Sequence, residues 1–436
     1  MIHYPQPIAW EQEFNRWLQL RAEHGAAGLE EKVAEIRTIL RSCADEIMAL
    51  PADEALSARE PDDLESIRVL RPDGRRVMRT DLADEEYRER LAGAFLGRCA
   101  GCTLGSPVEL LSIEKMERWA AYVGDPFPPE RYWSQVQRPH ELSYGVSPRA
   151  AFTRDRMDGV PADDDTISTL LGLLILEEYG PEFTVDDVGR AWLDYLPYAC
   201  TAEEVALENL RRGLPAGKAG EAGNPYSQFI GADIRSDPWG YVAPGLPERA
   251  AELAYNDALL SHRRNGIYGA MYFAAAIAAA FVLDDPVDAL QVGLEEIPAD
   301  CLFAEAIRWA LDVAPEIHDY RDANAAITER YAGMDAIHAV NNGALTVWGL
   351  TIGKRDFSRI IGETVAMSYD NDCTAATAGS IAGAVLGREG IPAHWWTSFN
   401  DKAFSYLKGH QEFRIDDVLD RFSLQARRVR ATAARE

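Results

Sequence analysis

The sequence predicts an all-α globular fold in which peripheral helices surround a group of central helices. Apolar residues recur at helical spacing along most of the 436-residue chain, whereas strong strand patterns are nearly absent. Small residues line four of the central stretches, which favours helices packed closely in a core. No short-period internal repeat is present, so we expect a globular helical assembly rather than a simple bundle.

Residues 1–85 are interpreted as an N-terminal helical extension and residues 86–436 as the main domain. Within the extension, residues 10–24 and 29–48 carry Leu, Ile and Val at helical spacing, with charged residues on the other side. The first residues are too polar for a signal peptide, and the extension shows no pattern that points to chemistry.

A helix is expected from Asp84 to Gly105, where the chain passes from charged to small and apolar residues. Cys99 and Cys102 form a CxxC pair within it. Because no second pair follows, a packing role is favoured over zinc or redox chemistry. Glu109 follows the end of this helix, either as a carboxylate beside the core or as an ordinary surface residue.

Residues 110–161 form a long irregular segment rich in Pro, Tyr, Trp, Phe and Arg. Such segments are typical of the rim of a ligand cleft, and equally of a structural loop. Asp163, Asp164 and Asp165 come next, followed by an apolar helix over residues 167–179.

The following segments alternate between helices and polar junctions. Residues 217–245 are irregular and contain Arg235, while His262 lies at a junction where a lone His is typically a cap or a core hydrogen-bonding residue. Asn341 and Asn342 precede a small apolar helix. Helical spacing and cap residues predict helices over residues 184–196, 201–212, 247–260, 267–281, 286–296, 301–311, 322–331, 337–350 and 356–368, and over the tail from residue 416.

Residues 369–387 begin with two carboxylates, Asp370 and Asp372, and continue as a run of Ala, Gly, Ser and Thr. Gly379 and Gly383 each cost roughly 1 kcal/mol relative to Ala in a helix, which indicates close approach to a neighbouring helix. Free N–H groups and a partial positive charge at a helix N-terminus hold ionised carboxylates in place.

The two acidic stretches share one layout, because each precedes a buried helix. Either stretch alone is most simply a helix cap. If the two helices are neighbours, up to five carboxylates converge, and such a cluster requires a cation. Oxygen ligands favour a hard ion, which is Mg²⁺, Ca²⁺ or Mn²⁺.

Composition excludes several classes of function. The formal net charge of −26 argues against a nucleic-acid-binding surface and against binding to anionic membranes. The longest apolar run, residues 269–283, is shorter than the roughly 20 residues that a membrane span needs. Six scattered cysteines fit a reduced compartment. We therefore expect a cytoplasmic protein in which an anionic substrate needs local Arg, Lys or metal charge.

From Asp84 to Arg388 the sequence resembles the ADP-ribosylglycohydrolases, an all-α family that includes the dinitrogenase-reductase-activating enzyme. Residues 105–109 match the family's Gly-x-Pro-x-Glu-like segment. Residues 163–166 match its first acidic motif, and residues 370–373 match its second, in the same order along the chain. Residues 261–270 and the Asn341–Asn342 pair resemble a bacterial sub-branch.

The resemblance implies a binuclear Mg²⁺ site that acts on an N-glycosidic bond to ribose. Glu109 would lie near the anomeric carbon, and His262 and Arg235 would contact ribose or phosphate. The implied metal ligands are Asp164, Asp165, Asp370 and Asp372, with Asp163 in place of the family's usual Thr and Cys373 in place of a Thr or Ser. Asn341, Asn342 and Tyr369 complete the substrate-binding candidates.

The departures from the family pattern bear on the substrate. A thiol at Cys373 is a poor Mg²⁺ ligand, Cys102 stands where many members have Asp, and Tyr369 replaces a Gly and adds bulk. The resemblance implies as substrate an ADP-ribosylated protein, an ADP-ribose derivative or, given these departures, a smaller N-riboside. An Asp of the cluster or Glu109 is the general base. The alternative is a catalytically silent relative that binds a nucleotide or serves a structural role.

Overall fold

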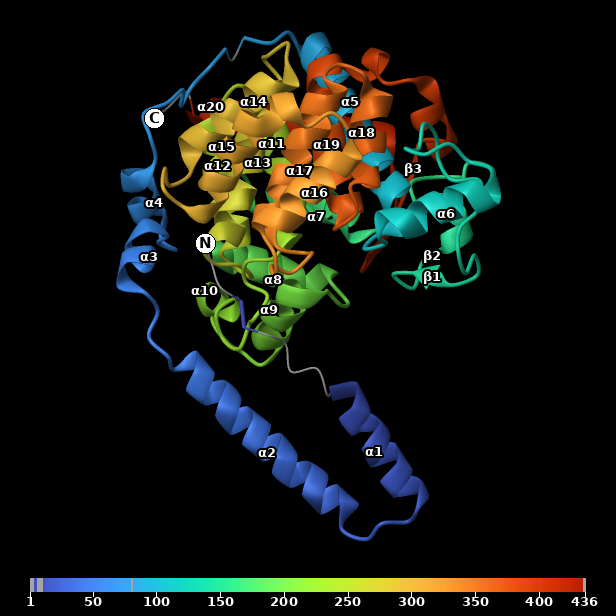
Figure 1. The fold of residues 1–436 in the computed structure, drawn as a ribbon. Coiled ribbons are helices and arrows are strands. Elements are labelled where there is room, and N and C mark those ends of the chain that lie inside the picture. Colours follow the sequence, from blue (N-terminus) through green and yellow to red (C-terminus); the bar gives the residue numbers. More distant parts are fainter. Residues whose placement is uncertain (1–3, 6–10, 80, 434–436) are drawn as a thin grey trace. The chain divides into compact units, whose positions relative to one another are not determined.

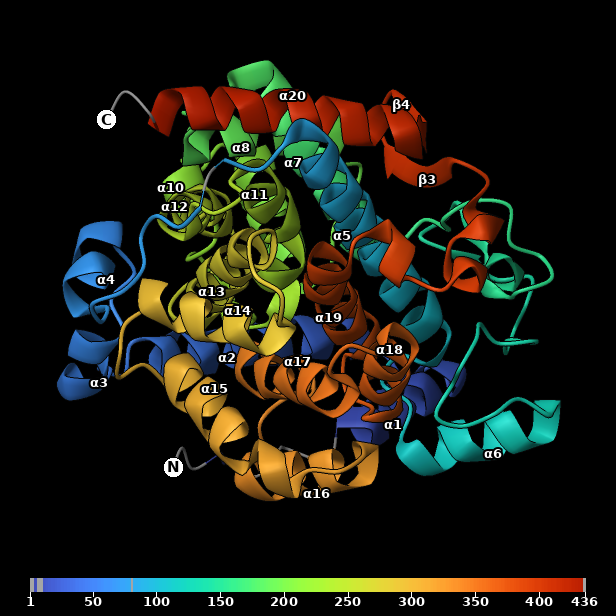
Figure 2. The same cartoon turned by 90° about the horizontal axis from the view of Figure 1, so that it is seen from above.

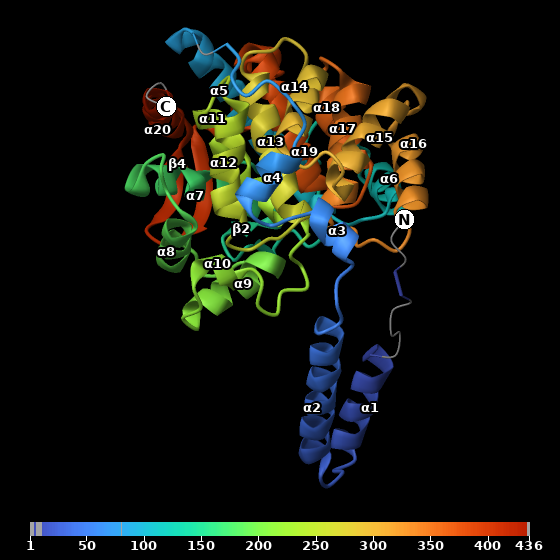
Figure 3. The ribbon, with the colours of Figure 1, turned by 90° about the vertical axis from the view of Figure 1, so that its left-hand side faces the viewer.

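A computed structural model describes residues 4–5, 11–79 and 81–433 of the chain (Figure 1). The chain divides into two compact units, Met1–Ala58 and Arg59–Glu436. The first unit contains helices α1 (Glu11–Glu23) and α2 (Leu29–Met48), which lie side by side in opposite directions (Figure 3). Both helices are confirmed, although the predicted start at Trp10 lies outside the described residues.

The regular structure of the second unit is mostly helical, which confirms the all-α prediction. Among the described residues, no helix is both long enough and apolar enough to span a membrane. With α3 (Glu54–Arg59) at the junction, its α-helices are α4 (Leu64–Leu70), α5 (Asp84–Gly105), α6 (Ile113–Val123), α7 (Asp164–Tyr179), α8 (Val185–Tyr195), α9 (Thr201–Arg211), α10 (Ala216–Ala219), α11 (Asp237–Val242), α12 (Pro247–Ala258), α13 (Asn265–Ala280), α14 (Pro286–Gly293), α15 (Leu302–Val313), α16 (Tyr320–Arg330), α17 (Ala339–Gly353), α18 (Phe357–Ala366), α19 (Asn371–Leu386) and α20 (Ile415–Ala433).

Helices α13, α17 and α19 form the centre of this unit, with α6, α15, α16 and α20 toward its periphery (Figure 2). Every residue of α13 is buried, as its unbroken apolar and Ala-rich sequence predicts. Helix α5 packs against α19 along a stripe of small residues, so the backbones of these two helices meet directly. The central helices therefore form the core that positions the N-termini of α7 and α19.

Two small antiparallel hairpins interrupt the helical pattern. Strands β1 (Leu142–Ser143) and β2 (Ser147–Pro148) form the first, and β3 (Lys402–Leu407) and β4 (His410–Arg414) form the second, with Ala403 opposite Phe413. The second hairpin was not predicted, although β3 alternates between partly exposed and buried residues.

The segments expected to be irregular contain helices. Helix α6 lies within residues 110–161, where it buries Met116 and Ala120 on one face. The 3₁₀ helix η3 (Ile230–Arg235) and α11 lie within residues 217–245. The elements η3 and α11 span six residues each, so their periodicity extends over too few residues to be recognised. Helix α6 spans 11 residues and was missed because the whole Pro-rich and aromatic segment around it was interpreted as irregular.

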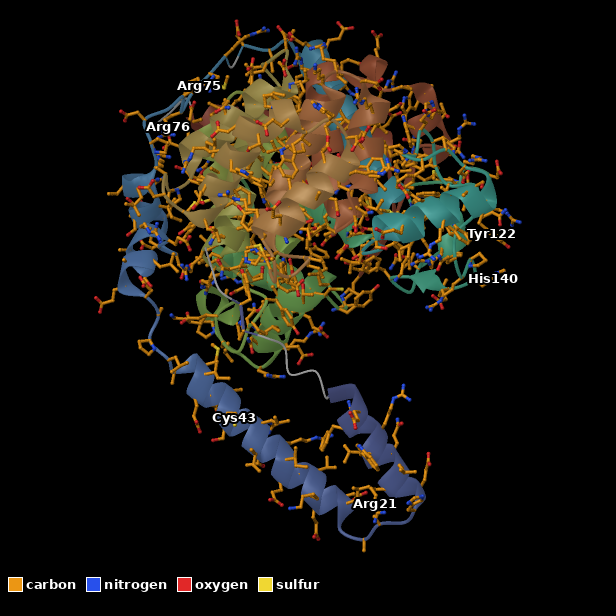
Figure 4. All side chains as sticks on the ribbon, viewed as in Figure 1. Arg21, Cys43, Arg75, Arg76, Tyr122 and His140 are labelled. Carbon is orange, nitrogen blue, oxygen red and sulfur yellow. The ribbon has the colours of Figure 1, made fainter. Side chains whose placement is uncertain are left out.

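Residues 59–79 belong to the second unit by their contacts. Ile67 of α4 is fully buried, and Arg71 and Arg76 both form ion pairs with the buried Glu296 at 2.7 and 2.9 Å. Figure 4 labels Arg75 and Arg76 on the segment between α4 and α5. The two compact units thus divide between residues 58 and 59. The sequence places the start of the main domain at residue 86, and that boundary stays a prediction.

Candidate metal centre and adjoining cleft

The N-termini of α7 and α19 meet in the core and bring the two acidic stretches together. Carboxylate oxygens of Asp165 and Asp372 lie within 4.8 Å of each other and of the Cys373 sulfur. Oxygens of Glu109, Asp370 and Asp372 form a second group within the same distance of one another. Residues about two hundred positions apart in sequence therefore share one cluster.

Small residues on α5 and α19 explain why the cluster forms at this place. A Cβ atom at Gly97 would lie 2.2 Å from the Gly379 carbonyl oxygen, and one at Gly105 would lie 2.5 Å from the Asp372 Cα. Real Cβ atoms do not approach other atoms so closely, so the contact requires glycine. The stripe therefore sets the position of Asp372 at the end of the α5–α19 contact.

The loop before α19 is tied to the segment that carries Glu109. Ser368 and Tyr369 have positive φ angles of 71° and 62°, which turn the chain into the helix. The Tyr369 carbonyl oxygen accepts a hydrogen bond from the Leu110 backbone N–H at 3.0 Å. This bond holds Glu109 beside Asp370.

A buried arginine compensates part of the negative charge. Arg98 of α5 is fully buried and donates to Asp165 Oδ1 at 3.1 Å and to Asp237 Oδ2 at 2.6 Å. Two carboxylates share this one guanidinium, so it does not compensate the charge of the other acids of the cluster when they ionise. Neither Arg98 nor Asp237 was predicted, although a lone Arg within a run of small residues is the signal that points to it.

Four carboxylate oxygens of the cluster are buried and have no hydrogen-bond partner among the described residues. They are Asp163 Oδ2, Asp165 Oδ2, Asp370 Oδ1 and Asp372 Oδ1. A buried acceptor without a partner costs roughly 1–3 kcal/mol, and more when it is charged. Divalent cations remove this cost by binding to several of these oxygens at once, so the donor set fits a metal centre.

Burial and mutual repulsion raise the pKa values of the cluster acids in the absence of a cation. The pKa values of Asp163, Asp165 and Asp372 lie well above the usual range, mainly because of burial and then because of neighbouring acids. Burial also raises the pKa of Asp370 to about 6. Such values are characteristic of functional sites.

Glu109 combines an exposed position with a perturbed carboxyl group. The residue as a whole is exposed, yet its carboxyl faces the cluster, and its pKa is raised to about 8 by desolvation and by the charge of Asp370. Arg149 opposes this shift. A cation bound near Glu109 would favour the ionised form of its carboxyl group.

A cleft of about 150 Å³ opens onto the cluster. Tyr144, brought by the first hairpin, donates a hydrogen bond from its hydroxyl to Asp164 Oδ1 at 2.6 Å. Tyr198 packs with its ring centroid 4.7 Å from that of Tyr406, which comes from β3. The acids that line the cleft are Glu109, Asp164, Glu203, Asp370 and Asp372, and its apolar and aromatic wall includes Tyr144, Ile167, Leu171, Trp192, Ile234 and Tyr406.

Arg235 lines the cleft, but its charge is already paired. Its guanidinium donates to Glu203 at 2.5 Å, to Asp257 at 2.6 Å and to Ser261 Oγ at 2.9 Å, and it lies over the Trp192 ring. Neither Glu203 nor Trp192 was predicted as part of the site. No local pattern distinguishes them from ordinary helix residues.

His262 lies behind Arg235 and does not line the cleft. It is fully buried, with Nδ1 2.8 Å from Ser261 Oγ. Burial lowers its pKa well below the usual range, and the charges of Arg235 and Arg263 add to this effect. The imidazole is therefore neutral and supports the Ser261–Arg235 network.

The remaining predicted binding residues support the cluster from outside the cleft. Asn342 Oδ1 accepts the Asp370 backbone N–H at 3.3 Å, and Asn341 Oδ1 accepts the Asn342 N–H at 2.8 Å. The Tyr369 hydroxyl lies 3.1 Å from Thr328 Oγ1. The structure thus places Asn341, Asn342 and Tyr369 around the loop that presents Asp370, and none of them lines the cleft.

Comparisons with known proteins relate the chain to one family. The sequence model of a family described as ADP-ribosylglycohydrolase matches residues 83–428. An uncharacterized protein from Archaeoglobus fulgidus is 28% identical over 326 residues, which cover 72% of this chain and 93% of the relative. A solved structure titled "ADP-ribosylglycohydrolase-related protein complex" is 21% identical and covers 79% of this chain and 99% of its own, with a TM-score of 0.49.

Proposed function

The chain belongs to the ADP-ribosylglycohydrolase family, as its motifs predicted, and we propose that it is a metal-dependent hydrolase of an N-glycosidic bond to ribose. Family membership supports a glycohydrolase-type function. The observation that carries the finer proposal is the convergence of Asp165, Asp370 and Asp372 with Glu109 beside a cleft, with buried oxygens that have no partner among the described residues.

The proposed cofactor is a pair of divalent ions, with Mg²⁺ as the first expectation and Mn²⁺ or Ca²⁺ as alternatives. Glu109, Asp370 and Asp372 would hold one ion, and Asp165, Asp372 and Cys373 the other, with Asp163 and Asp164 beside them. When bound, such ions fix the vicinal hydroxyls of ribose and lower the pKa of a bound water.

Cleavage of an N-glycosidic bond develops positive charge on the anomeric carbon. Glu109 and Asp370 face the point where the cleft meets the cluster, so their negative charge stabilises that state. Glu109 is the proposed base that takes the proton of the attacking water, with an Asp of the cluster as the alternative. The wall formed by Ile167 and Trp192 limits the access of bulk water.

The charge of the cleft favours the ribosyl group over the pyrophosphate as the recognised part of the substrate. Its lining contains five carboxylates, and the one Arg in it is already paired with Glu203 and Asp257. A pyrophosphate would receive no uncompensated side-chain cation from these lining residues. Small, uncharged N-ribosides are therefore the favoured substrates, and ADP-ribosylated protein or an ADP-ribose derivative stays within the proposal with its pyrophosphate outside this lining. The proposal keeps a cytoplasmic location without nucleic-acid or membrane partners.

The test measures thermal unfolding of the metal-stripped protein with Mg²⁺ or Mn²⁺, each with ribose or ADP-ribose, and then hydrolysis of ADP-ribosyl-arginine and of simple nucleosides. We expect stabilisation by the metal alone, a further increase when ribose or ADP-ribose is added, and turnover of at least one N-riboside. Binding without turnover of any N-riboside contradicts the proposal and supports a catalytically silent relative.

A further inference from the structure

Two buried cysteines lie beside the acidic cluster, and each belongs to a group that includes Asp165. The sulfur of Cys373, on α19, lies within 4.8 Å of carboxylate oxygens of Asp165 and Asp372. The sulfur of Cys102, on α5, lies within the same distance of oxygens of Asp163 and Asp165. The group formed by Glu109, Asp370 and Asp372 contains oxygen atoms alone.

The backbone contact between α5 and α19 fixes where these sulfurs lie. A Cβ at Gly101 would come within 2.0 Å of the Ala375 carbonyl oxygen, and one at Gly105 within 2.5 Å of the Asp372 Cα. Cys102 lies between these two glycines, and Cys373 directly follows Asp372. Both thiols are buried, with 1% and 7% exposure, so neither can turn away into solvent.

The carboxylates beside the sulfurs retain free acceptor atoms. Arg98 donates a hydrogen bond to Asp165 Oδ1, whereas Asp165 Oδ2 is buried without a partner among the described residues. Asp372 Oδ1 is buried and unpartnered in the same way. Each sulfur therefore lies within 4.8 Å of an oxygen of Asp165, and one oxygen of that carboxylate has no hydrogen-bond partner among the described residues. The unpartnered oxygen is an observation independent of the cysteine positions.

We propose that the metal centre is asymmetric, with one all-oxygen position for a hard ion and one sulfur-containing position for a zinc-like ion. Glu109 and Asp370 bind the hard ion, and Asp165 and Cys373 bind the zinc-like ion, which is Zn²⁺, Fe²⁺ or Co²⁺. Asp372 belongs to both groups and bridges them. Thiolate ligands favour these ions, whereas carboxylates alone favour Mg²⁺.

Binding at the sulfur position forms a bond between the metal and the Cys373 sulfur and releases the thiol proton to solvent, so no electron transfer is involved. The inference rests on the metal centre assigned in the proposed function, but it does not require catalytic turnover. The competing interpretation is that both thiols only donate hydrogen bonds to the neighbouring carboxylates.

The experiment uses the full-length, metal-stripped protein in which the exposed Cys43 and Cys200 are replaced by Ala. Co²⁺ is titrated in the presence of excess Mg²⁺, and near-ultraviolet thiolate-to-cobalt charge-transfer absorption is recorded. We expect this absorption in the parent protein and its loss in Cys373→Ser. The same substitution should lower the affinity for Co²⁺ at least about tenfold more than it lowers the affinity for Mg²⁺. Cys99→Ala is the matched control, because Cys99 is buried in the same helix as Cys102 and belongs to none of the three groups.

Co²⁺ binding without charge-transfer absorption overturns the proposal, because the thiols then act only as hydrogen-bond donors. Absorption that survives in Cys373→Ser and disappears in Cys102→Ser also overturns the assignment of Cys373. Circular dichroism establishes that each Ser variant keeps its helical fold. A cobalt–thiolate signal in a protein that hydrolyses no N-riboside would reject the proposed function and leave the asymmetric centre standing.

Discussion

Asp372 is the residue on which the candidate site converges. It belongs to the all-oxygen group and to the group with Cys373, and one of its oxygens is buried without a partner among the described residues. Its side chain is 3% exposed, so its charge requires a cation or a proton. Asp164 contributes from α7, where Tyr144 orients its carboxylate.

Asp164→Asn and Asp372→Asn should each lower kcat by at least about a hundredfold, because Asp372 is a proposed metal ligand and Asp164 supplies negative charge beside the ions, and an amide replaces neither charge. Both variants should also lose the rise in melting temperature that divalent metal produces, while circular dichroism stays unchanged. Asp186→Asn is the matched control, since Asp186 is an exposed acid in the first turn of α8. Wild-type turnover in either test variant would remove that residue from the site.

Glu109→Gln should lower kcat by about 10²–10⁴-fold with a smaller change in KM, because the amide keeps the size of the side chain but can neither accept a proton nor supply the charge that Glu109 contributes to the all-oxygen metal position. Steady-state kinetics on the best N-riboside checks this expectation. An unchanged kcat would show that Glu109 is a surface residue and would transfer the base role to an Asp of the cluster.

At the scale of elements, the contact between α5 and α19 determines the geometry of the centre. Gly93, Gly97 and Gly101 lie four residues apart on one face of α5, and each meets a backbone carbonyl of α19. The Gly-rich composition of both helices indicated close packing from sequence. The identity of the partner helix required the structure, because helical periodicity describes a face and not the element that covers it.

Gly97→Ala should reduce the free energy of unfolding by about 1–3 kcal/mol or more, since its Cβ would lie 2.2 Å from a backbone oxygen that cannot move aside. It should also weaken metal binding by shifting α19. Gly217→Ala, in α10, is the control: nothing lies within 4 Å of its Cβ, so we expect a neutral effect or stabilisation of up to about 1 kcal/mol. Equal unfolding free energies for the two variants, measured with denaturant, would contradict the role of the stripe.

At the scale of the whole molecule, the excess of acids connects metal binding with stability. Folding brings the acids of the cluster together inside the second unit, whereas unfolding separates them in water. The burial and mutual repulsion of these acids destabilise the folded protein, and the same acids provide the proposed ligands. Stability and metal occupancy should therefore depend on each other.

The metal-free protein should become less stable as pH rises from about 4 to about 8. The native pKa values of Asp370 and Glu109, about 6 and about 8, exceed the usual values near 4, so the native state binds more protons than the unfolded state in this window. Saturating divalent metal should flatten or reverse the trend, because the metal binds the ionised acids. Melting temperatures across this pH range, with and without chelator, check the sign, and stability that rises with pH in chelator would contradict it.

Truncation tests the extent of the second unit. Removal of residues 1–58 should leave thermal unfolding and metal binding of the remainder unchanged, because the acidic cluster lies within Arg59–Glu436. Removal of residues 1–85 should strongly destabilise the protein. It deletes the buried Ile67 and leaves Glu296 without Arg71 and Arg76. Equal stability of the two truncated proteins would support the boundary near residue 85 instead.

The sequence by itself determined the all-α class, the bounds of most helices and both acidic motifs. Helix α5 runs from Asp84 to Gly105 as predicted, because apolar spacing and cap residues act within a few turns of the chain. For the same reason, Asp163 and Asp370 could be recognised at helix starts.

The tertiary structure alone decided which other residues join those acids. Cys102 had been assigned to packing, Arg98, Glu203 and Tyr406 had not been singled out, and His262 proved to lie behind the cleft. These positions depend on how helices and a short hairpin pack across hundreds of intervening residues. Local periodicity carries no information about such contacts, whereas the close approach of α5 and α19 fixes them.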